Sequence, residues 1–277
     1  MIEKRAFIFI VLVYKDYMDL IDLCNSLKEN VADTFKVIIV DAFFDNETSA
    51  KVQEIAMHFE CDYLPVENKG YGYGNNRGMD YAKEKYEYSW IVICNPDTIL
   101  RSKLSSNKLE CYKQIVAPRI VTKNRKHQNP YWAYENRLSE KLIFLGYKNR
   151  NRGFLYLGIG INKLLRYLFL LINLITAGKV RRIYACHGSF LIMRDEFANM
   201  FRYDESFFLF CEEACLAYDS KRERATTSYA SEISVLHKED GSMSVAEIDE
   251  KPLLKQAYLT YYRKYRLANI KRERLKD

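Results

Sequence analysis

Residues 90–100 read Trp-Ile-Val-Ile-Cys-Asn-Pro-Asp-Thr-Ile-Leu, an apolar run that ends abruptly in a polar turn. The run at 90–94 predicts a buried strand of a parallel sheet, because such strands are covered on both faces. Pro96 lacks a backbone N–H and therefore ends the strand. Asp97 is then expected at the carboxyl end of a central strand, where a carboxylate can hold a divalent cation beside a phosphate. A plain Asn-Pro-Asp turn without chemistry fits these three residues equally well.

Alternating strand and helix patterns fill the first hundred residues. Apolar runs predict strands at 6–13, 35–40, 61–66 and 90–94, and apolar side chains at helical spacing predict helices at 16–30, 50–59 and 78–86. Between them, residues 45–48 predict a polar turn, and residues 70–77, rich in Gly and Asn, predict a loop. The alternation is typical of a parallel sheet with helices on both faces, which predicts the α/β fold class.

Acidic and small polar residues follow the ends of several of these strands. Right-handed crossovers place the carboxyl ends of parallel strands on one edge of a sheet. Asp41, Asp45, the loop at 70–77 and Asp97 should therefore lie along the same edge. Independent structural turns would not need acids and glycines at one edge, so the convergence indicates a binding site.

The pattern is less regular beyond residue 100. Strands are expected at 114–121, in the second half of 183–194 and at 226–236, a short helix is expected from Cys211 onward, and residues 127–152 are expected to be irregular. From Tyr261 onward the chain carries seven Lys or Arg and two acids. This composition predicts a helix with a solvated basic face, with contact to anionic lipid as the alternative.

Residues 153–178 form an apolar segment whose only charges are Lys163 and Arg166. The uncharged part after Arg166 is shorter than the roughly 20 residues that a spanning helix needs. Flanking basic residues at 179–182 favour a helix that lies in the membrane interface. A helix hairpin or a homodimer contact is the alternative interpretation.

Composition limits the class of protein. The 277 residues suffice for one large domain or two small ones, and the net charge of +7 favours anionic partners. Nucleic-acid binding is disfavoured because no recognisable module accompanies the charge. The seven cysteines include no C-x-x-C pair, which argues against structural zinc and fits a reducing cytosol. The run at 6–13 is expected to be a first strand rather than a signal peptide.

Seven short motifs occur in the order that is typical of one enzyme family. They are Val40-Asp41 with Asp45, residues 67–78, Asn95-Pro96-Asp97, residues 187–190, residues 204–208, Glu212-Glu213, and residues 237–242. With these motifs the chain resembles the family 2 inverting glycosyltransferases of the GT-A fold. It is most similar to the rhamnosyltransferase-like branch that builds bacterial surface polysaccharides. Each motif alone is weak, but the ordered set, spanning residues 5 to about 245, is specific.

The resemblance implies a fold, a division of the chain and a reaction. The fold would be a GT-A, Rossmann-like, mostly parallel sheet with helices on both faces and a C-terminal helical segment. Residues 1–100 would bind the nucleotide sugar, residues 101–245 the acceptor, and residues 246–277 would form a basic helical tail. The enzyme would move a sugar from a nucleoside diphosphate sugar to a hydroxyl of a lipid-linked oligosaccharide, at the cytoplasmic face of the cell membrane.

The resemblance also implies roles for individual residues. The implied donor-binding residues are Asp41, Asp45, Asn68, Gly70, Gly74, Asn75, Asn76, Asn95 and Asp97. Asp97 and His237 would bind Mg²⁺ or Mn²⁺, which stabilises negative charge on the leaving diphosphate. Glu213 would be the catalytic base with Glu212 beside it, and repulsion between two adjacent acids raises a pKa toward the working pH.

The chain departs from the family pattern mainly on the acceptor side. Asn95 replaces the first acid of the D-x-D motif, Glu213 replaces an Asp, and Cys215 stands where another acid is usual. A non-catalytic subunit that binds a nucleotide sugar, or a membrane scaffold, is therefore an alternative function. A nucleotidyltransferase is less favoured, because no Gly-rich, basic loop follows the first strand.

Overall fold

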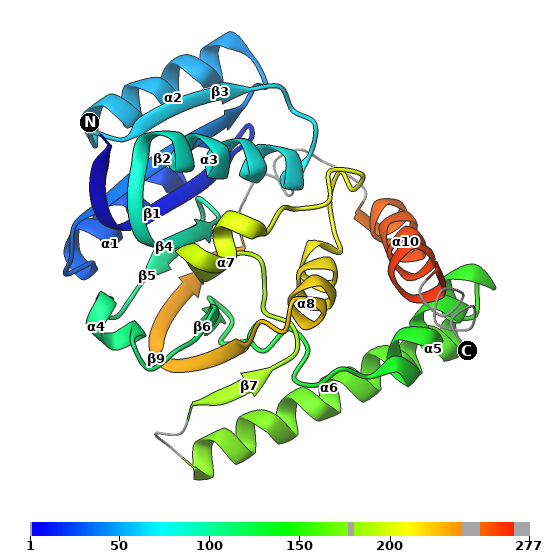
Figure 1. The fold of residues 1–277 in the computed structure, drawn as a ribbon. Helices are drawn as coiled ribbons and strands as arrows, with labels where there is room; N and C mark the ends of the chain where they lie inside the picture. Colours follow the sequence, from blue (N-terminus) through cyan, green and yellow to red (C-terminus); the bar gives the residue numbers. More distant parts are fainter. Residues whose placement is uncertain (1, 177–179, 240–249, 269–277) are drawn as a thin grey trace.

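The computed structural model describes residues 2–176, 180–239 and 250–268, and a mixed nine-stranded sheet runs through this part (Figure 1). The strand order is β3-β2-β1-β4-β8-β6-β9-β5, and β7 pairs with β9. The strands are β1 (Glu3–Val13), β2 (Phe35–Ala42), β3 (Asp62–Val66), β4 (Tyr86–Cys94), β5 (Thr98–Leu100), β6 (Ile115–Thr122), β7 (Arg181–Ile183), β8 (Phe190–Arg194) and β9 (Thr227–His237). The helices are α1 (Asp19–Asn30), α2 (Asn46–His58), α3 (Tyr71–Lys85), α4 (Ser106–Leu109), α5 (Arg137–Lys148), α6 (Arg152–Ile175), α7 (Asp195–Met200), α8 (Glu212–Arg222) and α10 (Glu250–Tyr261), which continues into the π-helical segment η1 (Tyr262–Leu267).

The first four strands are parallel, as the alternating pattern predicted. Successive side chains of a strand point to opposite faces, and β1 is buried on both. Phe7 and Phe9 pack with α1 and α2, whereas Ile8 and Ile10 pack with α3. The expected α/β fold with helices on both faces is therefore confirmed.

The sheet changes direction after β4. On one side β4 pairs in parallel with β1, and on the other it pairs antiparallel with β8, Cys94 facing Phe190. Farther on, β6 and β9 are parallel to each other, while β5 and β7 run antiparallel to β9. The sheet is therefore mixed over its second half, and the expectation of a mostly parallel sheet holds for its first half.

Residues 70–77 form the first turns of α3, so the predicted loop is wrong. The glycines of this stretch let the helix lie close to the sheet. A Cβ atom at Gly74 would overlap Leu12, and one at Gly78 would come within 2.6 Å of Ile10 Cγ2. Glycine content indicated a loop because sequence alone does not distinguish a flexible turn from a tight helix-on-sheet contact.

Two other helices differ from their predicted limits. The predicted polar turn at 45–48 is the start of α2, where Asp45 is the N-cap and accepts a hydrogen bond from the Thr48 N–H at 2.7 Å. The stretch predicted as irregular contains α5, which Asn136 caps through the Ser139 N–H at 2.9 Å. α5 and α6 then form the helix hairpin that was one alternative for the apolar segment: Gly146 lies against Leu155, and Gly158 lies against Ile143.

One side of the C-terminal helices packs on the domain. Tyr261 is fully buried, and Arg266, 8% exposed, donates to Glu140 Oε1 at 2.6 Å and to Glu135 Oε1 at 2.9 Å. Arg263 and Lys264 are exposed, so the segment has the predicted solvated basic side in addition to the buried Arg266. Residues 177–179, 240–249 and 269–277 lie outside the described part. They include the second half of the predicted turn at 237–242 and the rest of the basic tail.

Replacing Arg266 with methionine should destabilise the protein by about 3 kcal/mol, because the change leaves the buried Glu140 carboxylate without its cation. The free energy of unfolding from urea titrations measures this loss. Arg263→Met is the matched control on the exposed side of the same segment, with an expected change within about 0.5 kcal/mol. Equal effects of the two substitutions would contradict a structural role for the Arg266–Glu140 pair.

Candidate active site

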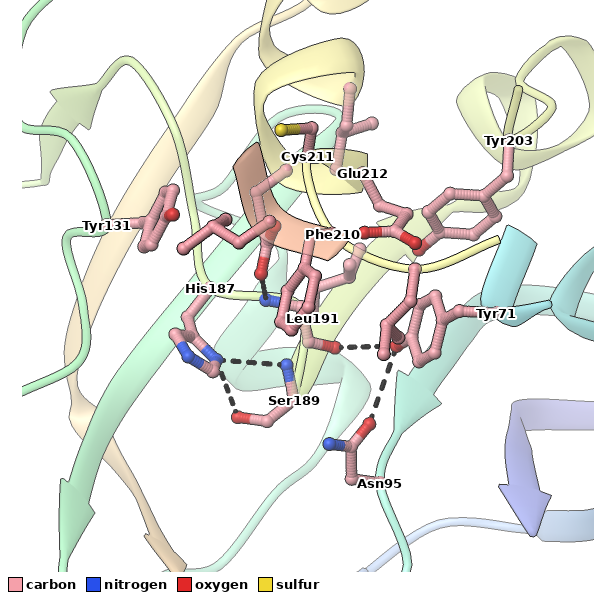
Figure 2. A pocket seen from close by; sticks show the side chains of 15 residues that line it. Tyr71, Asn95, Tyr131, His187, Ser189, Leu191, Tyr203, Phe210, Cys211 and Glu212 are labelled. Atoms are coloured by element: carbon pink, nitrogen blue, oxygen red, sulfur yellow. Dashed lines mark hydrogen bonds between the residues drawn. The ribbon is translucent and has the colours of Figure 1, made fainter. Parts of the chain in front are cut away.

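A cavity of about 350 Å³ opens where β4 meets β8, and Figure 2 shows the side chains around it. Asn95 enters from the end of β4, Gly188 from the turn before β8, and Glu212 and Glu213 from the first turn of α8. Leu254 of α10 completes the wall. The cavity thus joins segments that are far apart in the sequence.

Two residues in left-handed conformation direct the acid pair into the cavity. Phe210 and Cys211 have φ values of 73° and 72°, so the chain turns sharply just before α8 begins. The same segment is held from the other side, because the Tyr71 N–H donates to the Phe208 carbonyl at 2.8 Å. Gly70, with φ of 106°, lies so close to Phe208 that a side chain would overlap its carbonyl.

The two glutamates differ in their surroundings. Glu213 Oε1 accepts a hydrogen bond from the Gly188 N–H at 3.2 Å, whereas Glu212 Oε1 is buried without a partner in the described part of the chain. Burial raises the pKa of Glu212 to about 8, and the charge of Glu213 adds to the effect. Burial also raises the pKa of Glu213, but the Gly188 N–H opposes that rise. Near neutral pH we expect Glu213 to be the ionised member and Glu212 to hold the proton.

Asp97 and His237 lie together, as the sequence predicted. Asp97 Oδ2 is 3.2 Å from His237 Nε2, and both side chains are buried. His237 Nδ1 is 2.7 Å from Gln128 Oε1, and Gln128 Nε2 in turn donates to Glu239 Oε1 at 2.9 Å. Because an amide oxygen only accepts, the His237 proton sits on Nδ1.

This arrangement suits a divalent cation. His237 donates a hydrogen bond from Nδ1 to Gln128, which leaves Nε2 as the ring nitrogen beside Asp97 Oδ2, and an imidazole nitrogen and a carboxylate oxygen can both bind a divalent cation. The described residues contain no group of three or more His, Cys, Asp or Glu side chains placed to hold a metal. A cation at Asp97 and His237 would therefore take its other ligands from substrate phosphates and water, as Mg²⁺ commonly does.

Asp41 and Asp45 lie at the carboxyl end of β2, on the expected edge of the sheet. Asp41 is buried and accepts a hydrogen bond from the Tyr63 hydroxyl at 2.7 Å. Asp45 is exposed and caps α2, and the Thr48 N–H lowers its pKa. The structure thus gives Asp45 a role in the helix, and nucleotide contacts of both acids stay predictions.

The asparagines of α3 mostly organise the fold. Asn76 is buried, accepts from the Tyr203 N–H and donates to the Tyr203 carbonyl, both at 2.9 Å. Asn75 donates to the Tyr71 carbonyl at 3.0 Å, and its buried Oδ1 has no partner in the described part. Asn68 lies in the half-buried segment before α3. Gly74 and Asn76 thus have packing roles in this fold, and their contacts with the donor stay predictions.

Four residues of the site were not among the site residues predicted from the sequence. Tyr71 donates to the Gly188 carbonyl at 3.1 Å and lies 3.5 Å from Asn95 Oδ1, so it ties α3, β4 and β8 together (Figure 2). Tyr131 and Gln128 come from the stretch expected to be irregular. His187 lines the cavity wall and accepts from the Ser189 N–H at 3.1 Å through Nδ1. Burial lowers its pKa to about 3, so it is neutral.

Comparisons with known proteins give distant sequence relatives. No family model matches the chain. Rhamnosyltransferase WbbL of Escherichia coli K12 is 25% identical over 228 residues, covering 74% of each chain. The low-salt glycan biosynthesis hexosyltransferase Agl10 of Haloferax volcanii is 22% identical over 238 residues, covering 82% of this chain and 66% of its own length.

Solved structures share the fold. GalNAc-T7, solved with UDP, GalNAc and Mn²⁺, superposes with a TM-score of 0.57 at 11% identity, over 84% of this chain and 43% of its own. Staphylococcus aureus TarS superposes with a TM-score of 0.53 at 12% identity, over 84% of this chain and 36% of its own. The fold is therefore that of the GT-A glycosyltransferases. The sequence relatives support the family 2 resemblance and indicate a glycosyltransferase of glycan biosynthesis.

Glu212→Gln should stabilise the protein increasingly as the pH rises. Below about pH 4.5 the Glu212 carboxyl is protonated in both the folded and the unfolded protein. Between about pH 4.5 and the folded-state pKa of about 8, this carboxyl ionises in the unfolded chain but stays protonated in the folded protein. Wild-type stability is lost across this window, and the amide variant avoids the loss, on the order of 2–4 kcal/mol by about pH 8. Urea unfolding at about pH 5 and about pH 8 measures the difference. The exposed Glu84→Gln control should show no such trend, and a pH-independent effect at Glu212 would refute the raised pKa.

Proposed function

We propose that this protein is an inverting, metal-dependent family 2 glycosyltransferase. It would move a sugar from a nucleoside diphosphate sugar to a hydroxyl of a lipid-linked oligosaccharide in surface-glycan synthesis. One observation carries the proposal: Asn95 of the Asn-Pro-Asp turn and the acid pair Glu212-Glu213 line the same cavity. A donor held at the turn would thus present its sugar to a buried carboxylate.

Asp97 and His237 are the residues that would hold Mg²⁺ or Mn²⁺. When bound, the ion supplies positive charge that stabilises the leaving diphosphate. Gln128 orients His237 because its Oε1 accepts a hydrogen bond from the His237 Nδ1–H. Such contacts to a metal-binding residue contribute strongly to metal affinity. Asp41, with Tyr63, would contact the nucleoside from the neighbouring strand end.

Glu213 is the proposed catalytic base. The oxygen of the acceptor hydroxyl attacks the anomeric carbon and loses its proton to the Glu213 carboxylate. The sugar–phosphate bond breaks on the opposite face of the sugar. This single displacement inverts the anomeric configuration. Glu212 keeps its proton, which limits the charge repulsion beside the base. The Gly188 N–H holds the Glu213 side chain in place.

The donor is proposed from the resemblance and from the relatives. Deoxythymidine diphosphate rhamnose is the first candidate, since the branch and one sequence relative are rhamnosyltransferases. A uridine diphosphate hexose is the second candidate. The proposed place of action is the cytoplasmic face of the cell membrane, where nucleotide sugars and lipid-linked acceptors meet.

Asp97→Ala should abolish the metal-dependent part of donor binding. In a thermal-shift panel of nucleotide sugars with and without Mn²⁺, one donor should raise the melting temperature of the wild type only when the metal is present. At a concentration of 100 times its Kd, that donor adds about 2.7 kcal/mol to the free energy of unfolding. The variant loses this shift because it lacks the carboxylate ligand. Asp80→Asn, on the surface beside Arg202, should retain it. An unchanged metal-dependent shift in Asp97→Ala would count against the donor site.

Within the same experiment, Glu213→Gln separates catalysis from binding. The amide should leave the donor shift in place, and it should slow nucleoside diphosphate release in the presence of lipid-linked oligosaccharide by about 10²–10⁴-fold. A rate equal to that of the wild type would remove Glu213 as the base. Donor binding by the wild type without any turnover would favour the non-catalytic alternative.

A further inference from the structure

α6 has an apolar face that no other described element covers. The helix has 24 residues, and Figure 1 shows it along the outer edge of the molecule. Its exposed apolar side chains recur at helical spacing along its whole length. They are Phe154, Tyr156, Leu157, Leu164, Tyr167, Leu168, Leu171, Ile172, Leu174 and Ile175. Contiguous apolar surface of this kind marks a site of contact.

The opposite side of α6 packs against the domain. Gly158 and Phe169 are buried there, with Phe169 edge-on to Tyr229 at a ring-centroid distance of 5.6 Å. By length and composition alone α6 is the one described helix that could cross a membrane, when its whole length with Lys163 and Arg166 is counted. A helix attached to its domain along one side presents only the other side to lipid, which fits a position on the membrane surface.

Charge identifies the partner. No acidic residue occurs between Glu140 and Asp195, whereas ten Lys or Arg fall in that interval. Lys163 is exposed on α6, and the exposed Lys148 and Arg152 lie at the start of the helix. A second copy of the same face would bring like charges together, whereas an anionic lipid surface offers the opposite charge to all of them.

α6 also adjoins the wall of the active-site cavity. Asn162 Nδ2 is 3.5 Å from the Tyr131 carbonyl oxygen, and the Tyr131 ring meets the His187 ring edge-on at 6.0 Å. Both rings line the cavity. A membrane that covers the outer face of α6 would therefore lie beside the acceptor side of the site.

We propose that α6 docks the protein onto an anionic membrane surface. The apolar face from Phe154 to Ile175 would enter the headgroup boundary, with Lys163 and the basic residues at the start of the helix on lipid phosphates. This position would bring the membrane beside the cavity that Tyr131 and His187 line. The idea that the acceptor arrives from this membrane rests on the proposed function, but lipid binding itself does not.

Flotation of the full chain with vesicles tests the docking. The wild type should float with vesicles that contain phosphatidylglycerol and much less with pure phosphatidylcholine. The double variant Leu171→Glu, Leu174→Glu should partition about tenfold more weakly or worse, because two exposed leucines become charged. Met18→Glu with Met57→Glu, 65% and 68% exposed outside α6, is the matched control and should float like the wild type.

Three results would overturn the inference. They are a wild type that never floats, a leucine variant that floats as well as the wild type, and a dimer in light scattering that the leucine variant alone dissociates while vesicles bind neither. The metal-dependent donor shift is measured on the same samples. Its loss in every form would count against the proposed function, whereas flotation alone decides the docking.

Discussion

The antiparallel pairing of β4 with β8 is the constraint on which the site depends. It extends past the strand ends through the hydrogen bond from the Asn95 N–H to the Ser189 carbonyl at 2.8 Å. This contact places the Asn-Pro-Asp turn against the His187–Ser189 turn, whose Gly188 N–H holds Glu213. The donor side of the sheet is therefore joined to the His187–Ser189 turn by backbone contacts, and this turn holds the Glu213 side chain through the Gly188 N–H.

Burial gives the polar groups at this junction their chemistry. Water is kept from Glu212 and Glu213, so their pKa values rise, and a carboxylate becomes a stronger base near neutral pH. The same burial keeps His187 neutral and leaves Asp97 facing His237 without solvent to separate them. Buried charge of this kind is costly in a folded protein, and such costs are typical of catalytic sites.

Much of the first half could be predicted from the sequence because its strands are continuous apolar runs. The pairing of Asp97 with His237 came from the family resemblance, since local patterns do not join residues 140 positions apart. Residues 70–77 were misread because their glycines serve close packing on Leu12 and Ile10. α5 and the buried Arg266 depend on partners from distant segments. The same holds for Gln128, because its partner His237 comes from the distant strand β9.

Asp97 and His237 are proposed to hold a divalent cation beside the junction of β4 with β8. Paramagnetic broadening of the four histidine ring signals by Mn²⁺, with a nucleoside diphosphate present, tests this proposal most directly. We expect the signals of His237 and of neighbouring His187 to be lost, and the signal of His58, at the end of α2, to persist. A sharp His237 signal under these conditions, or equal broadening of all four, would contradict the account.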